Sequence, residues 1–323
     1  MTILRTATTW LSVAWLLALV ASAHAQGTAP AASEASSFLG GFLKETRVVY
    51  PLRVGAWEAR GEHRYEEQEL GASVRYAGAH KDRWIDLYFY PAGVLPETRL
   101  AEDIQSTLEG IRTTVGRPGG YSEIDIAPVT MRRFSVGTGK QKRSIPAGST
   151  SMRLLRGDKA YSSAVTMLVM DLYYVKARFS AEESVLSRRQ VQKQLDKFTA
   201  EVVRAMTIRS TGECWMPPPI VQKSALVRDA PGQLMKTEKD GTLSAVAYAD
   251  RVEALDATSP EAVVMQFLSM PLSGRHFPGC NAPEDMNPAV PADMRELRLE
   301  FNAPREGGRN QSTPLRMRRT EVS

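Results

Sequence analysis

Residues 149–179 read STSMRLLRGDKAYSSAVTMLVMDLYYVKARF, and this stretch decides the fold. Gly157-Asp158 lies between two runs of strand character, a pattern typical of a β-hairpin. The second run, Ala164–Phe179, is rich in valine and aromatic residues and has the strongest strand character in the chain. We therefore expect antiparallel strands at the centre of the protein.

Three further strands are predicted before this hairpin. Trp57–Tyr65, Ala72–Tyr76 and Arg83–Tyr90 are separated by the turn-rich segments ELGA and GAHKD. Alternate residues of the third strand are apolar, which indicates a sheet with a buried face.

Two amphipathic helices complete the pattern. The first is predicted to end at Gly116, and its buried stripe is Leu100, Ile104, Leu108, Ile111 and Val115. The second is predicted to begin at Ser180, because Ser180 and Glu183 have the spacing of a capping box. Its buried stripe is Val191, Leu195, Phe198, Val202 and Ala205, and Lys193, Lys197 and Glu201 remain for the solvated face.

The elements together predict an α+β fold. We expect an antiparallel sheet flanked by the two amphipathic helices in a domain at 41–208. A smaller α+β module is expected at 209–303. It is predicted to contain strands and a helix that begins at Ser259-Pro260 and stops at Pro271. A leader (26–40) and a basic tail (304–323) are expected to be poorly ordered.

The order of these elements resembles the PsbP/Mog1-like α/β/α sandwich over residues 48–208. The resemblance depends on WIDLYFYP (84–91), the helix ETRLAEDIQSTLEGIRTTVG (97–116), the strand DLYYVKARFS (171–180) and a closing helix that runs into AMTIRS (205–210). That family contains non-enzymatic assembly and binding proteins, so by analogy the resemblance implies an interaction role.

The first 25 residues have the three parts of a secretory signal peptide. Arg5 provides the basic start, an apolar run follows, and Ala23-His24-Ala25 matches the small-residue cleavage pattern. We expect cleavage after Ala25 and a periplasmic or secreted protein that does not span the membrane once the signal is removed.

The compartment decides how the two cysteines are interpreted. An even number of cysteines in an oxidising compartment favours pairing, so a disulfide between Cys214 and Cys280 is predicted. The alternative is a copper or zinc site in which His276 joins the two cysteines, since His276-x-x-x-Cys280 brings an imidazole close to a thiol. No other metal site and no cofactor is predicted.

Catalytic motifs are not evident in the sequence. G-x-S-x-G is absent, and GTGK at 137–140 lacks the first glycine and the Ser or Thr of a phosphate loop. Whether the protein is an enzyme stays open, and the missing motifs favour a protein that is not one.

Charge and composition limit the partners. The chain of 323 residues has a net charge of +5, which is too diffuse to indicate nucleic acid. The leading hypothesis is a non-catalytic binding or assembly protein whose partner is another envelope protein or a cell-surface component. An envelope hydrolase with a site assembled from dispersed residues is the second hypothesis, and a copper or zinc binder is the third.

Overall fold

The computed structural model describes residue 39 and residues 41–80, 82–137, 139 and 142–302. The predicted signal peptide, nearly all of the predicted leader and the basic tail lie outside the described residues. Leu39, at the end of the leader range, is described and is buried in the main core.

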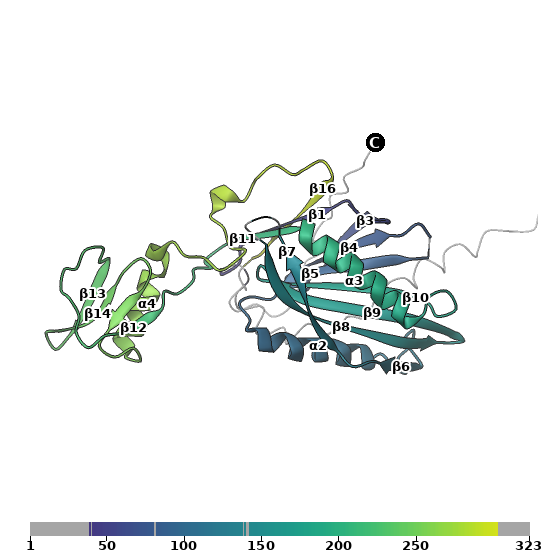
Figure 1. Ribbon diagram of the computed structural model, residues 1–323, viewed down its shortest axis with the longest axis horizontal. Helices are drawn as coiled ribbons and strands as arrows, with labels where there is room; N and C mark the ends of the chain where they lie inside the picture. The colour runs from purple at the N-terminus through teal and green to yellow at the C-terminus, as the bar shows by residue number, and fades with distance from the viewer. Residues whose placement is uncertain (1–38, 40, 81, 138, 140–141, 303–323) are drawn as a thin grey trace, which may run out of the picture.

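Within the described chain, a nine-stranded sheet forms the body of the protein (Figure 1). Hydrogen-bonded neighbours follow the order β2-β3-β4-β5-β10-β9-β8-β6, and β7 also pairs with β8. Every pairing in this sheet is antiparallel. The strands are β2 (Arg53–Val54), β3 (Trp57–Arg64), β4 (Ala72–Ala77), β5 (Trp84–Pro91), β6 (Glu123–Ile126), β7 (Thr130–Val136), β8 (Arg143–Arg156), β9 (Lys159–Met170) and β10 (Tyr173–Glu182). A short 3-10 helix, Gln68–Leu70, joins β3 to β4.

The predicted hairpin is confirmed. Arg156 pairs with Lys159 across the turn, and the register continues along β8 and β9. Gly157 has a φ of 61°, a conformation that glycine adopts without the steric cost of a side chain.

Two helices, α2 (Glu97–Arg112) and α3 (Arg188–Ala205), pack on opposite faces of this sheet. Met167 belongs to the core under α2, whereas its neighbour Leu168 belongs to the core under α3. Successive residues of a strand point to opposite faces, so the two helices lie on opposite sides. The predicted stripe of α2 is buried through Ile111, but Val115 is exposed because the helix ends at Arg112.

The predicted start of α3 is wrong. Ser180 belongs to β10, which ends at Glu182 just before Glu183, and the Ser180 Oγ atom shares a hydrogen bond with Ser163 Oγ of β9. The helix is capped instead at Ser187, whose side chain accepts a hydrogen bond from the Gln190 backbone N–H while the Gln190 side chain bonds back to Ser187. Strand pairing therefore overrides the first capping pattern, and a second one begins the helix.

A three-stranded sheet, ordered β11-β1-β16, lies beside the large one. β1 (Glu45–Pro51) occupies its centre and pairs antiparallel with both β11 (Thr207–Thr211) and β16 (Met294–Glu300). The C-terminal strand of the described chain thus returns to the first strand. A 3-10 helix, Pro283–Asp285, precedes β16.

Between β11 and β16 the chain forms a small module that projects from the body (Figure 1). Its sheet has the order β12-β15-β14-β13, and α4 covers one face of it. The elements are β12 (Ile220–Gln222), β13 (Met235–Lys239), β14 (Thr242–Ala247), β15 (Val252–Ala254) and α4 (Pro260–Ser273). The predicted stop at Pro271 is wrong, because α4 continues to Ser273 and ends at Gly274 in the left-handed conformation.

The predicted fold class, an antiparallel sheet flanked by two amphipathic helices plus a smaller α+β module, is wrong. The described chain is mostly β and forms three separate sheets, and each helix packs on only part of a sheet face. The difference arises because segments without a clear alternating pattern pair with long strands. β7 and the first half of β8 widen the large sheet, and β11 and β16 build another around β1.

Among the described residues, no helix combines the length and apolar character that crossing a membrane requires.

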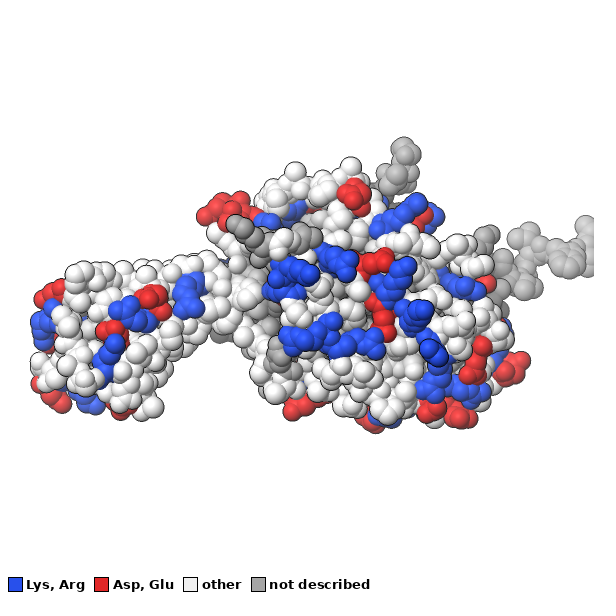
Figure 2. Space-filling view, in the orientation of Figure 1, with Lys and Arg blue, Asp and Glu red and all other residues white. Residues whose placement is uncertain are grey.

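Basic side chains are concentrated on the face of the body that carries α3. In Figure 2, lysine and arginine side chains gather over this face in two groups, with a line of carboxylates between them.

Candidate functional site

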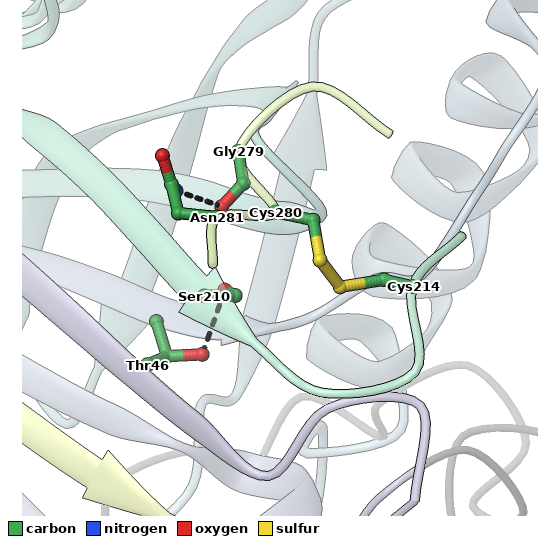
Figure 3. Close-up of a disulfide and its surroundings, with 6 residues drawn as sticks. All are labelled: Thr46, Ser210, Cys214, Gly279, Cys280 and Asn281. Carbon is green, nitrogen blue, oxygen red and sulfur yellow. Dashed lines mark hydrogen bonds between the residues drawn. A yellow bond between two sulfur atoms is a disulfide. The ribbon is translucent and has the colours of Figure 1, made fainter. Parts of the chain in front are cut away.

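Cys214 and Cys280 form a disulfide where the small module meets the body (Figure 3). Both cysteines are buried. Backbone hydrogen bonds fix the same place, since the Ser210 N–H donates to Gly279 O at 2.6 Å and the Asn281 N–H donates to Ser210 O at 2.7 Å. The bond therefore closes the base of the module.

The disulfide bears directly on the metal alternative. Sulfurs joined to each other do not offer the thiolates that a copper or zinc site needs. His276 packs against Trp215, with 4.4 Å between ring centroids. Across the described part of the chain, no three His, Cys, Asp or Glu side chains are grouped to hold a metal ion.

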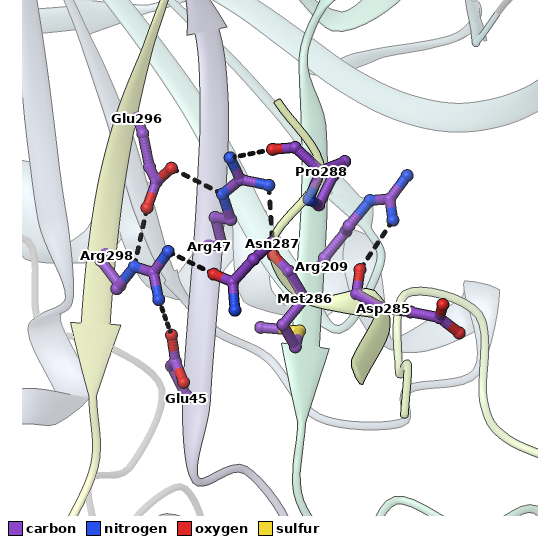
Figure 4. Close-up of polar contacts among 9 residues, drawn as sticks. All are labelled: Glu45, Arg47, Arg209, Asp285, Met286, Asn287, Pro288, Glu296 and Arg298. Carbon is purple, nitrogen blue, oxygen red and sulfur yellow. Dashed lines mark hydrogen bonds and ion pairs between the residues drawn. The ribbon is translucent and has the colours of Figure 1, made fainter. Parts of the chain in front are cut away.

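An arginine network attaches β16 to β1 (Figure 4). The Arg47 side chain is almost fully buried, and its Nε atom donates to Glu296 at 2.7 Å. Its other nitrogens donate to the backbone oxygens of Met286 and Pro288 at 3.1 and 2.7 Å. Arg298 also donates to Glu296, at 2.7 Å. This network has the chemistry of a structural support, because every charge in it is paired.

The other two described histidines, His63 and His80, lie in parts of the chain remote from His276. His63 lies on an exposed part of β3 beside Tyr65, and His80 lies in the turn before β5. His276, in contrast, lies beside Trp215 at the base of the small module. Among the described residues, neither His63 nor His80 is hydrogen-bonded to a serine or cysteine. The positions of these histidines therefore do not support a Ser-His-Asp triad assembled from dispersed residues.

Lys176 has the most displaced pKa of any described lysine. Its Nζ atom lies 4.8 Å from the centroid of the Tyr88 ring and 5.4 Å from that of Tyr90. Burial, assisted by the nearby charge of Arg178, lowers the pKa of Lys176 to about 8. Lys176 lies in the middle of β10 and is not part of the described lining of the α3 groove. Its position between two tyrosine rings therefore suits a structural role better than a catalytic one.

An open groove of about 540 Å³ runs beside the N-terminal half of α3. We call it the α3 groove. It is lined by Ser151, Arg188, Arg189, Gln192, Lys193 and Asp196. Ser151 belongs to β8, and α3 presents the other lining residues because its opposite stripe is buried against the sheet.

Asp196 lies in the α3 groove, but its charge is already neutralised. It forms an ion pair with Arg132 of β7 and accepts a hydrogen bond from Gln192 Nε2 at 2.8 Å. The hydroxyls of Ser149 and Thr166 also donate to it, at 3.4 and 3.5 Å. Arg132 and Asp196 thus hold α3 against β7 and β8. Asp196, the one carboxylate in the described lining of the α3 groove, is therefore already paired.

The cations of the α3 groove divide into paired and unpaired ones. Arg188 is paired with Asp125 at 2.5 Å and donates to Ser151 O at 3.0 Å. Arg189 and Lys193 are exposed, and among the described residues neither has an ion-pair partner. They are four residues apart on α3, which places them on the same face of the helix.

Two buried polar atoms, one on β7 and one on α3, also lack partners. Arg132 Nε and Gln192 Oε1 are shielded from solvent and have no hydrogen-bond partner in the described chain. One is a donor and the other an acceptor. Buried polar atoms in proteins are almost always paired, so both atoms depart from the usual pattern. The arrangement suits a ligand that carries negative charge together with hydroxyl groups.

The sequence contained part of this signal. Lys193 was assigned to the solvated face of the helix, which it occupies. The groove itself was missed, because the periodicity of α3 does not reveal which of its charged residues pair with β6 and β7.

Comparison with known protein families and with curated proteins finds no match to this chain. Among solved structures, the chain is similar to LpqN, described as involved in cell envelope biogenesis of Mycobacterium tuberculosis. The identity is 9%, the TM-score is 0.29, and the match covers 50% of this chain and 83% of LpqN. A likeness of this size carries no information about what this chain binds, and the PsbP/Mog1-like resemblance stays a prediction.

Proposed function

We propose that this protein is an exported, non-catalytic binding protein that recognises an anionic, hydroxyl-bearing component of the cell surface in the α3 groove. The class of ligand is a phosphorylated or carboxylated saccharide.

The observation that carries this proposal is the imbalance of charge in the α3 groove. Asp196 and Asp125 are both paired with arginines, whereas Arg189 and Lys193 have no partner among the described residues. Unpaired cations on a helix face form charge-assisted hydrogen bonds with phosphate or carboxylate groups. The lining also includes the amide of Gln192 and the hydroxyl of Ser151, polar groups that suit a ligand with hydroxyls of its own.

Export is supported by two features. The first 25 residues have the pattern of a signal peptide, and Cys214 and Cys280 are paired as expected in an oxidising compartment. An envelope location gives the α3 groove access to charged surface polymers.

A hydrolase is the weaker proposal for this groove. Its described lining includes no histidine and no unpaired carboxylate, so a general base is not at hand beside Ser151. The groove is also open to solvent, whereas catalytic pockets usually enclose much of their substrate.

Calorimetric titration with an oligosaccharide phosphate, and with the same oligosaccharide without phosphate, tests the proposal. We expect the phosphorylated probe to bind and the neutral one to bind at least about tenfold more weakly. The double variant R189Q/K193Q is expected to lose a similar factor. Its control is R60Q/R64Q, which removes the same charge from exposed positions of β3. Equal binding of both probes, or equal losses in both variants, would contradict the proposal.

A further inference from the structure

Helix α4 turns its largest apolar side chains toward solvent. Phe267 is 70% exposed, and four other residues of the helix are about half exposed. The exposed fractions are 45% for Val263, 56% for Val264, 55% for Leu268 and 57% for Leu272. These five residues are called the α4 face below. They cover about half the circumference of the helix, since successive residues are rotated by about 100°.

The opposite side of α4 is less apolar than the exposed one. Its buried residues are Ala262, Met265 and Ser269, which face the small sheet. Gln266 donates from Nε2 to Pro218 O at 2.7 Å on the same side. An amphipathic surface helix has the reverse arrangement, with its large apolar residues inside. Folding of the module alone therefore does not account for the α4 face.

The size of the α4 face is that of a functional patch. A phenylalanine side chain presents roughly 150–250 Å². With the other four side chains half exposed, the patch amounts to on the order of 400–500 Å². Patches of this size on a monomer often mark an interaction site.

Charge distinguishes between the kinds of partner. Glu261 is the one charged residue of α4, and it is paired with Lys239 at 3.3 Å. The module segment 215–279 contains seven carboxylates and six lysines or arginines. A helix that binds an anionic bilayer surface carries lysine or arginine beside its apolar face, and α4 carries none. A neutral protein surface fits better.

We infer that the α4 face binds the α4 face of a second copy of this chain. Packing around a two-fold axis would bring the two helices together antiparallel, with Phe267 near the axis because it lies close to the middle of the face. No charge would be buried, since the face has none. The helix dipoles would also oppose each other favourably.

The module is held in a position that allows this contact. Its two connecting segments are paired by backbone hydrogen bonds, from the Met216 N–H to Arg275 O at 2.8 Å and from the Phe277 N–H to Cys214 O at 3.2 Å. The run Pro217–Pro219 favours an extended, stiff chain in one of them. Figure 1 shows the module standing away from the body, and the body therefore leaves α4 uncovered.

The expected dimer is weak. Two α4 faces would bury on the order of 800–1,000 Å² in total, which lies at the low end for specific complexes. The dissociation constant is therefore expected at roughly 10–500 μM, and neighbouring copies held at a surface would strengthen the association.

Sedimentation velocity of the purified full-length mature protein tests the inference. Over roughly 5–500 μM, the average mass of the unmodified protein should rise toward that of a dimer. F267E should weaken association by about tenfold or more, because a charge would be buried at the axis. The matched control is V227E, which places the same charge on a residue of the module that is 65% exposed and lies outside α4. It should associate like the unmodified protein.

Three results would overturn the inference. They are a constant monomer mass across this range, association that F267E leaves intact, and an equal loss in V227E. Flotation with neutral or anionic phospholipid vesicles that depends on Phe267 would also overturn it, because it would assign the α4 face to lipid. Circular dichroism of each variant shows that the comparison is between folded proteins.

Discussion

Cys214 and Cys280 are joined, with their Cα atoms 6.1 Å apart, at the base of the two segments that carry the small module. The module is therefore an insertion whose ends are tied together covalently. Beside the disulfide, Ser210 of β11 is hydrogen-bonded to Gly279 and Asn281, so the base is tied to the body as well.

Removal of the disulfide should destabilise the protein. In the double variant C214S/C280S, the 66-residue separation is no longer closed in the unfolded chain, which costs about 4 kcal/mol on the chain-entropy model. Urea unfolding of the two proteins measures the difference in free energy. A loss below about 1 kcal/mol would show that hydrogen bonds at Ser210 close the module without the disulfide.

The Arg47–Glu296 pair should make stability depend on acidity. Burial of Glu296 favours its neutral form, but hydrogen bonds and charges from Arg47 and Arg298 outweigh burial and lower the pKa of Glu296 below its usual value. A lowered carboxyl pKa adds stability above the unfolded-state pKa, and this stability is lost as the pH falls through the folded-state pKa.

E296Q should therefore be less stable than the unmodified protein by about 1–3 kcal/mol at neutral pH, and the difference should shrink in acid. Urea unfolding at neutral and acid pH provides both values. The control is E58Q, which removes an exposed carboxylate paired with Arg60 and should cost less than about 1 kcal/mol. A difference for E296Q that does not change with pH would argue against the assigned role.

Lys176 should give a second rise of stability with pH, in the alkaline range. Because its pKa is lowered to about 8, the unfolded chain binds more protons at this residue between about pH 8 and the usual lysine pKa near 10.5. Stability from this residue should therefore rise with pH across that window. K176M has no titrating group at this position. The free energy of unfolding of the unmodified protein should therefore rise with pH relative to that of K176M. The check is urea unfolding of both proteins across the window, and parallel curves would contradict the prediction.

Some of the fold could be predicted from local sequence. Gly157-Asp158 specifies its hairpin because a tight turn needs few residues, and the stripe from Leu100 to Ile111 specifies α2 because a helix repeats every few residues. The start of α3 could not be chosen locally. Ser180 and Ser187 both begin capping patterns, and only pairing of β10 with β9 excludes the first.

Long-range relationships were beyond the sequence. Arg47 of β1 lies opposite Arg298 of β16 in the strand register, although the two residues are about 250 positions apart. Nothing in the local sequence of either strand predicts this partner. Likewise, α4 is apolar nearly all round, so periodicity could not reveal that Phe267 faces outward. The α3 groove depends on Asp125 and Asp196 reaching particular arginines, which is a property of the packed sheet.

The most direct test of the account is an NMR titration that maps where an anionic saccharide binds. Amide signals of the isotope-labelled mature protein would be followed while the oligosaccharide phosphate is added. Saturable shifts centred on residues 188–196 and on Ser151, and absent in R189Q/K193Q, are predicted. Shifts centred elsewhere, or shifts that persist in that variant, would contradict a binding site in the α3 groove.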